Sequence, residues 1–152
     1  MASGLWRAIL LVSMVMPTAA LEPDRQTTIL IVDDDLPFSR AAAELLADQG
    51  FRVIGHATTA HDAVVECRRL GPDAVLLDVR LPDGHGVELA GTLRAVSNPP
   101  RIVLTSSDSA AVSANQLRVS GASGFIPKSQ LVRSDLAAFF GGEATDEPDR
   151  GI

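Results

Sequence analysis

The chain alternates between short, continuously apolar runs and longer segments in which apolar residues recur at helical spacing. Residues 28–32 and 73–78 each contain four consecutive aliphatic residues, and aspartate closes each run. Runs without polar alternation are typical of strands in the middle of a parallel sheet, where both faces are buried. Shorter strands are predicted at residues 51–55, 101–105 and 124–126.

Five helices are predicted between and after these strands. The first begins near Pro37 and ends at Gly50, and the second begins at a capping pair of Thr59 and Asp62 and ends at Gly71. The other three are a helix that carries Leu89, Ala90, Leu93 and Val96, a weakly patterned helix over residues 109–120, and a helix that Ser129 caps and that packs through Val132, Leu136 and Phe139. Residues 81–86 are predicted to form a loop because of their Pro and Gly content.

The alternation of strands and helices defines the fold class. Strands joined through single helices imply right-handed crossovers and a parallel sheet that helices cover on both faces. We therefore expect an α/β fold with a doubly wound, five-stranded parallel sheet in residues 26–141, and no second domain. A chain of 152 residues is suited to one such domain.

Neither end of the chain has these patterns. Residues 1–25 combine Arg7 with a short apolar stretch, which imitates a secretory signal peptide and is too short to span a bilayer. An alternative is that translation begins at Met14 or Met16. We expect this second possibility, because the site inferred below belongs in the cytoplasm, and we expect residues 142–152 to form an acidic, disordered tail.

Composition narrows the classes of function. A formal net charge of −6 argues against nucleic acid as a partner. The only cysteine, Cys67, excludes an internal disulfide and lies on the apolar side of a predicted helix, where we expect it to be a core residue. Of 13 basic residues, only Lys128 is a lysine. A compositional drift toward arginine would leave one lysine by accident, and a position that needs an ammonium rather than a guanidinium group would also retain one.

Chemically active side chains follow four of the five predicted strands: Asp33 with Asp34, then Asp78, Thr105 and Lys128. Each of them alone also fits an ordinary turn or strand end. Ligands bind outside the carboxyl ends of parallel strands, so together they predict one site. Each pair of carboxylates about 4 Å apart costs roughly 4 kcal/mol at a surface-like dielectric, and a divalent metal together with one lysine would offset this repulsion.

These motifs, in this order, resemble the receiver domain of bacterial two-component response regulators over residues 28–140. The resemblance rests on residues 31–35, on Leu77-Asp78 followed by residues 81–84 and Gly86, on Thr105-Ser106, and on residues 124–128. It implies a flavodoxin-like fold with strand order 2-1-3-4-5.

The resemblance also implies roles for the acidic residues. Asp78 would be the phospho-acceptor. Asp34 would bind Mg²⁺ directly, Asp33 would act mainly through a coordinated water, and the backbone carbonyl of Arg80 would complete the protein ligands. Magnesium suits this set because it prefers one or two carboxylates together with phosphate oxygens.

By the same resemblance, Lys128 and Thr105 would each contact one phosphoryl oxygen. The movement of Thr105 would then allow an aromatic residue three positions before the lysine, here Phe125, to swing inward. The alternative for Phe125 is an ordinary core aromatic of a strand.

The interpretation that we favour is a stand-alone, cytoplasmic receiver that is a regulator rather than an enzyme. Its partners would be a sensor histidine kinase or a histidine phosphotransfer protein and an unknown downstream protein, with no direct DNA binding and no membrane span. Lys128 is followed by Ser129-Gln-Leu, as in receivers joined to a helix-turn-helix output, so a fragment of a longer transcription regulator is one alternative.

Two further alternatives are a receiver that binds partners without phosphorylation and an aspartyl-nucleophile phosphatase. The pattern Asp33-x-Asp35 suggests the phosphatase, but Pro37 stands where that family needs a hydroxyl.

Overall fold

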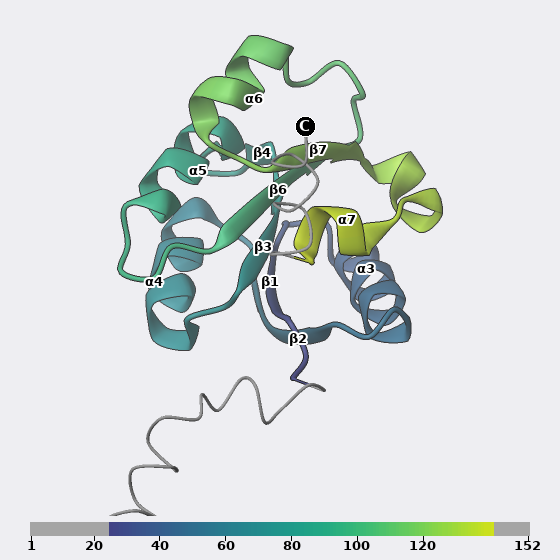
Figure 1. The fold of residues 1–152 in the computed structure, drawn as a ribbon. Helices are drawn as coiled ribbons and strands as arrows, with labels where there is room; N and C mark the ends of the chain where they lie inside the picture. The colour runs from purple at the N-terminus through teal and green to yellow at the C-terminus, as the bar shows by residue number, and fades with distance from the viewer. Residues whose placement is uncertain (1–24, 142–152) are drawn as a thin grey trace, which may run out of the picture.

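Five parallel strands form one sheet in the order β2-β1-β3-β6-β7, in the computed structural model, which describes residues 25–141 (Figure 1). The strands are β1 (Thr28–Val32), β2 (Arg52–Ala57), β3 (Ala74–Asp78), β6 (Arg101–Ser106) and β7 (Gly124–Pro127). Because β6 and β7 are the fourth and fifth strands of this sheet, the predicted order 2-1-3-4-5 is confirmed. β1 and β3 are central and almost completely buried, as their unbroken apolar runs predict.

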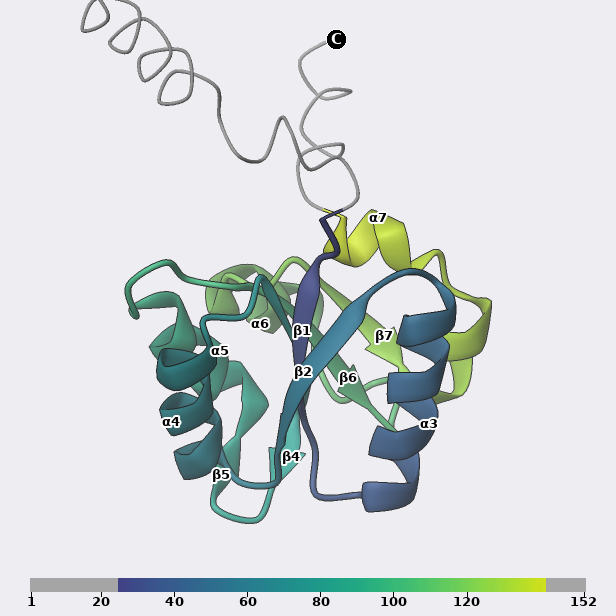
Figure 2. The ribbon, with the colours of Figure 1, turned by 90° about the horizontal axis from the view of Figure 1, so that it is seen from below.

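Helices cover both faces of the sheet (Figures 1 and 2). α3 (Leu36–Asp48) and α7 (Leu136–Phe140) lie against one face, and α4 (Ala60–Leu70), α5 (Gly86–Arg94) and α6 (Ala114–Ser120) lie against the other. The predicted starts of α3 and α4 are confirmed, and each of them is marked by a capping residue. Asp35 accepts a hydrogen bond from the Phe38 N–H at the start of α3, and Thr59 accepts one from the Asp62 N–H at the start of α4.

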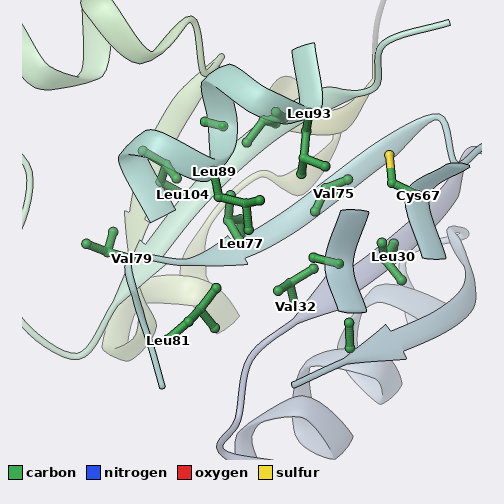
Figure 3. Packing of buried hydrophobic residues seen from close by; sticks show 14 residues of the cluster. Leu30, Val32, Cys67, Val75, Leu77, Val79, Leu81, Leu89, Leu93 and Leu104 are labelled. Atoms are coloured by element: carbon green, nitrogen blue, oxygen red, sulfur yellow. The ribbon is translucent and has the colours of Figure 1, made fainter. Parts of the chain in front are cut away.

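The larger core cluster joins β1 and β3 to α4 and α5 (Figure 3). Leu30 and Leu77 of the sheet are fully buried there, and so is Leu93 of α5. Cys67 of α4 is buried in the same cluster, as predicted. Burial raises the pKa of its thiol, and the positive charge of Arg68 offsets only part of this rise. The thiol is therefore a small apolar core group.

Three predicted elements differ from the structure. Residues 81–86 were expected to be a loop, but a two-stranded antiparallel hairpin of β4 (Arg80–Leu81) and β5 (Gly84–His85) forms there. The helix expected over 109–120 begins only at Ala114, because Ser113 and Gln116 form a reciprocal capping box. Residues before it form a turn, in which the Ala111 N–H donates to the Asp108 carbonyl.

The last predicted helix is also different. Lys128–Arg133 form a 3₁₀ helix, η1, without a side-chain cap from Ser129, and α7 follows after a break. The break changes the helical phase, so Leu131, Leu136 and Phe140 are buried while Val132 is 67% exposed. The predicted inward set of Val132, Leu136 and Phe139 was therefore wrong for Val132, and Phe139 is only half-buried.

The predictions for residues 1–25 and 142–152 lie outside the described residues, apart from residue 25. Within residues 25–141, no helix is both long enough and apolar enough to cross a membrane.

Candidate functional site

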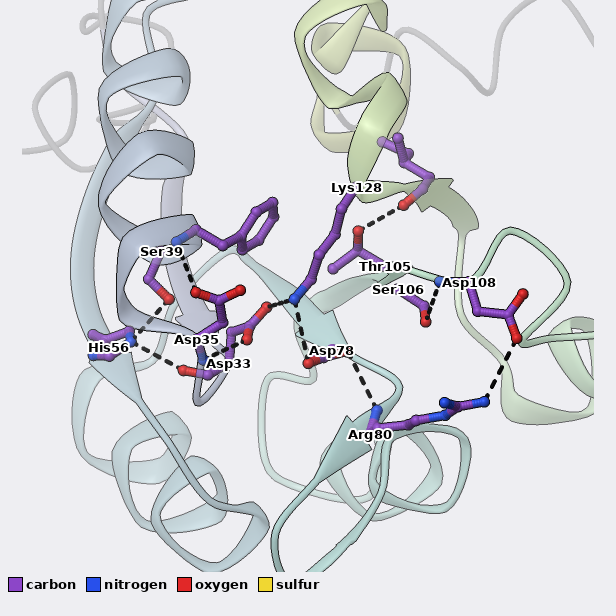
Figure 4. Close-up of polar contacts among 12 residues, drawn as sticks. Asp33, Asp35, Ser39, His56, Asp78, Arg80, Thr105, Ser106, Asp108 and Lys128 are labelled. Carbon is purple, nitrogen blue, oxygen red and sulfur yellow. Dashed lines mark hydrogen bonds and ion pairs between the residues drawn. The ribbon is translucent and has the colours of Figure 1, made fainter.

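Asp33, Asp78, Thr105 and Lys128, four of the predicted site residues, gather at the carboxyl edge of the sheet (Figure 4). Asp33 and Asp34 follow β1, Asp78 is the last residue of β3, and Lys128 directly follows β7. Strand register adds Thr105, which lies opposite Asp78 in the β3–β6 pair. The local reason is that each apolar strand stops where the chain leaves the core, so the first polar residue after it faces the edge.

Three carboxylates make up the centre of the site. One carboxylate oxygen from each of Asp33, Asp34 and Asp78 lies within 4.8 Å of the others. Asp33 is 1% exposed and Asp78 is 6% exposed, whereas Asp34 faces solvent. Such close, partly buried negative charges repel one another strongly and need a counter-charge.

Lys128 supplies one positive charge. Its Nζ lies 2.8 Å from Asp33 Oδ2 and 3.5 Å from Asp78 Oδ2, and its side chain is 12% exposed. Burial opposes the charged ammonium, but the close contact with Asp33 and the negative charges of Asp33, Asp78 and Asp35 outweigh it and raise the pKa of Lys128. Lys128 therefore stays protonated and bridges two of the three aspartates.

Among the described carboxyl groups, Asp78 has a strongly raised pKa. Burial and the negative charge of Asp33 raise its pKa to about 6, although Lys128 and the Arg80 N–H act in the opposite direction. The Arg80 N–H donates to Asp78 Oδ1 at 3.3 Å. One ammonium is thus too little positive charge for this group of carboxylates.

The donor set fits a divalent cation. Three carboxylates and one ammonium leave two formal negative charges. Asp33 Oδ2 is buried, and no described residue donates a hydrogen bond of ordinary geometry to it; its partner is the Lys128 ammonium. Hard oxygen ligands with unused lone pairs are the ligands that Mg²⁺ takes, and Asp33, Asp34 and Asp78 are the residues that could hold it.

Thr105 and Phe125, the residues of the predicted switch, lie on the neighbouring strands β6 and β7. Thr105 is completely buried, and its hydroxyl donates to the carbonyl of Ile126 in β7 at 2.6 Å. Phe125, next to Ile126, is half-buried against the cluster under α4 and α5. The hydroxyl of Thr105 is thus engaged with β7 and not with Asp78; its movement stays a prediction.

The loop after Asp78 is fixed at several points. The Gly86 N–H donates to the Val79 carbonyl at 2.6 Å, and a Cβ on Gly86 would lie 2.5 Å from the Asp78 carbonyl oxygen. The role predicted for the Arg80 carbonyl is not tested by these contacts. The Arg80 guanidinium points away from Asp78 and pairs with Asp108 at 3.5 Å (Figure 4).

Sequence reasoning missed several supports of the site. His56 Nε2 lies 3.2 Å from the Asp33 carbonyl oxygen and 3.0 Å from Ser39 Oγ. His56 of β2 therefore contacts both α3 and the acidic turn, which is formed by residues 33–35. The Asp83 carboxylate accepts the N–H groups of Ala60 and His61 at the start of α4. Neither contact has a local signal in the sequence, because each joins residues about 20 positions apart.

A further missed neighbour is Phe38, whose ring centroid lies 4.4 Å from Lys128 Nζ. The spacing of Phe38 along the first helix indicates by itself only a core position. The contact depends on where β7 ends relative to α3, which spacing along the chain does not indicate.

Known proteins resemble the chain over most of its described part. The family model of the response regulator receiver domain matches residues 29–138. A protein-glutamate methylesterase/protein-glutamine glutaminase of Idiomarina loihiensis is 35% identical over 104 residues, which cover 66% of this chain and 26% of that protein. The DNA-binding response regulator MtrA of Mycobacterium tuberculosis is 43% identical over 79 residues, which cover 51% of this chain and 33% of that protein. The chain therefore spans about a quarter to a third of these curated relatives.

Solved structures share the fold. The signal receiver domain of NarL from Mycobacterium tuberculosis has a TM-score of 0.65 and 27% identity, over 77% of this chain and 98% of that chain. A CheY-like response regulator receiver protein from Methanospirillum hungatei has a TM-score of 0.66 and 24% identity, over 84% of this chain and all of that chain. The predicted flavodoxin-like fold is thus confirmed.

Proposed function

The chain belongs to the response regulator receiver domain family, and on this premise we propose that it is a switch whose Asp78 accepts a phosphoryl group from a phosphohistidine. One observation carries the proposal: a partly buried lysine, Lys128, bridges Asp33 and Asp78 at the carboxyl edge of the sheet, with Asp34 beside them. A structural ion pair with Lys128 would not need a cluster of three carboxylates, whereas a phosphoryl-transfer site needs oxygen ligands for a metal ion that neutralises charge.

The proposed reaction is an in-line transfer. A carboxylate oxygen of Asp78 forms a bond to phosphorus, the bond between phosphorus and the imidazole nitrogen breaks, and that nitrogen keeps the electron pair. The product on Asp78 is an acyl phosphate. Because the phosphoryl group and the carboxylate are both anionic, the protein contributes mainly alignment and charge neutralisation.

Asp33, Asp34, Asp78 and the carbonyl of Arg80 would hold Mg²⁺, which when bound neutralises the acidic residues and phosphoryl oxygens. Lys128 would neutralise one further oxygen, moving from Asp33 Oδ2 to the phosphoryl group. The raised pKa keeps the Lys128 ammonium charged for this task.

Thr105 would transmit the change. To donate to a phosphoryl oxygen, its hydroxyl must give up the bond to the Ile126 carbonyl. This exchange would remove the hydrogen bond that the Thr105 side chain makes to β7. It would also leave space beside Thr105, toward which the ring of Phe125 could turn. The phosphorylated and free states would then differ around β7 and α6, which gives a downstream protein something to distinguish.

The partners proposed are a sensor histidine kinase or histidine phosphotransfer protein and a downstream protein, in the cytoplasm. The relatives named above carry the matching segment within longer proteins, so a stand-alone role and a role as part of a longer regulator both stay open. A phosphatase reaction is less well supported, because Asp35 caps α3 by accepting the Phe38 N–H.

The test is chemical phosphorylation. With Mg²⁺ and a small phosphodonor such as acetyl phosphate, intact-mass spectrometry should show one added phosphoryl group on the wild-type protein and none on Asp78→Asn. Asp73→Asn, which changes an aspartate at the opposite edge, is the matched control and should be modified normally. An unmodified wild-type protein would support the reading of a receiver that acts without phosphorylation.

A further inference from the structure

We propose that Phe38 is a positioning residue for Lys128, and that its ring holds the ammonium in place for phosphoryl transfer; the proposal rests on the function proposed above. Lys128 Nζ lies over the ring of Phe38, 4.4 Å from its centroid, well inside the distance for a cation–π interaction. The same nitrogen contacts Asp33 and Asp78. The ring and the two carboxylates therefore share one cation.

The ring itself is held by the acidic turn. The Asp35 carboxylate accepts the Phe38 N–H at 3.1 Å, and Asp33 Oδ1 accepts the Asp35 N–H at 2.8 Å. Ser39, the next residue, lies within hydrogen-bond distance of His56. One short segment thus carries both an aspartate that binds Lys128 and the aromatic ring that covers it, so their geometry is set together.

A neutral aromatic partner suits this position for an electrostatic reason. A further carboxylate would also attract Lys128, but it would repel the phosphoryl group and raise the pKa of Asp78 further. The face of a ring attracts a cation without adding a formal charge. Phe38 therefore offsets part of the cost of burying the ammonium and leaves the negative charge of the site unchanged.

The ring also permits movement. Lys128 Nζ lies 2.8 Å from Asp33 Oδ2 but 3.5 Å from Asp78 Oδ2, so it must move toward Asp78 to meet a phosphoryl oxygen there. A hydrogen-bond acceptor would fix the ammonium in one geometry. The ring face attracts the ammonium over a range of positions. Lys128 can therefore move from Asp33 to a phosphoryl oxygen on Asp78 and still contact the ring of Phe38.

Three variants test the proposal. Phe38→Leu keeps an apolar side chain on α3 but removes the ring, and Phe38→Tyr restores it. Phe139→Leu is the control, because Phe139 is partly buried against the same core cluster but lies on α7. With acetyl phosphate and Mg²⁺, we expect Phe38→Leu to be phosphorylated about 3- to 10-fold more slowly, and Phe38→Tyr and Phe139→Leu to stay within about 2-fold of wild type.

Two readouts separate positioning from general packing. In NMR spectra of the unphosphorylated protein, the ring current of Phe38 should shift the Lys128 ε-CH₂ protons upfield in wild type and Phe38→Tyr, and this shift should be lost in Phe38→Leu. In a Lys128→Ala background, Phe38→Leu should cause no further loss of rate.

The outcomes for the two proposals differ. If wild type is phosphorylated and Phe38→Leu matches its rate, or if the losses from Phe38→Leu and Lys128→Ala add fully, the role of Phe38 is overturned while the switch function stands. If wild type takes up no phosphoryl group, the proposed function itself fails, and the rate effect of Phe38 fails with it.

Discussion

Asp78 is held in a charged state that its surroundings oppose. The unfolded chain would titrate this group near its ordinary pKa of about 3.9, whereas burial and Asp33 raise the pKa to about 6 in the folded protein. Between these values the folded state retains a proton that the unfolded state has lost. The contribution of Asp78 to stability therefore falls as pH rises from about 4 to about 6.

The corresponding prediction concerns Asp78→Asn without metal. At pH 7.5 the variant should be more stable than wild type by about 1–3 kcal/mol, because it removes a buried negative charge that lies beside Asp33. Urea unfolding in the presence of a chelator measures the difference. Near pH 4 the two proteins should unfold at similar urea concentrations. Saturating Mg²⁺ should raise the unfolding free energy of wild type more than that of the variant, because the variant lacks one carboxylate ligand. A less stable Asp78→Asn at pH 7.5 would contradict this account of the site.

Among the elements, α6 begins later than sequence reasoning predicted. The apolar pattern over residues 109–120 is too weak to define a helix start. In the structure the start is set by Ser113, whose hydroxyl accepts the Gln116 N–H while the Gln116 side chain accepts the Ser113 N–H. This Ser-x-x-Gln pattern was readable in the sequence, so a search for caps would have corrected the prediction.

Ser113→Ala should therefore loosen α6. We expect a loss of about 0.5–1 kcal/mol in the free energy of unfolding and faster amide exchange in residues 114–120, because the Gln116 N–H at the helix start loses the hydroxyl that accepts it. Ser109→Ala is the control, since Ser109 lies outside the helix in the preceding turn. Equal effects from both substitutions would mean that the helix begins near residue 109 after all.

At the scale of the whole molecule, the edge of the sheet opposite the site has a polar clasp of its own. Asp73 precedes β3, and its carboxylate accepts the N–H and the hydroxyl of Thr28 at the start of β1, together with a hydrogen bond from Arg25. Burial acts to raise the pKa of Asp73, but these three donors outweigh it and lower the pKa. The clasp joins the two central strands where they begin.

Asp73→Asn should lower the stability at pH 7 by about 1 kcal/mol, a modest value because the group is partly exposed. A lowered folded pKa means that this contribution is present above the unfolded value of about 3.9 and is lost as pH falls through the folded value. Urea unfolding of both proteins from pH 7 down to pH 3 should show the difference shrink. A constant difference would show that the charge of Asp73 is not its source.

The sheet and the site were predictable for one shared reason. Unbroken apolar runs identify buried strands, and the residues that close them lie at a common edge of the sheet. The sequence alone therefore predicted that Asp33, Asp78 and Lys128 lie together. The contact of Phe38 with Lys128 and the capping of α4 by Asp83 could not, because each depends on how two remote elements pack. The break before α7 escaped prediction because its apolar residues also fit one continuous helix.

The placement of the two described ends has a consequence for how this domain can be combined with others. β1 begins, and α7 lies, at the edge of the sheet opposite the aspartates (Figure 2). A module fused before residue 25 or after residue 141 could therefore emerge at the edge opposite Asp78, the proposed phospho-acceptor, and leave it accessible to a phosphodonor protein. This geometry also recommends either end of the described domain for surface immobilisation in binding experiments.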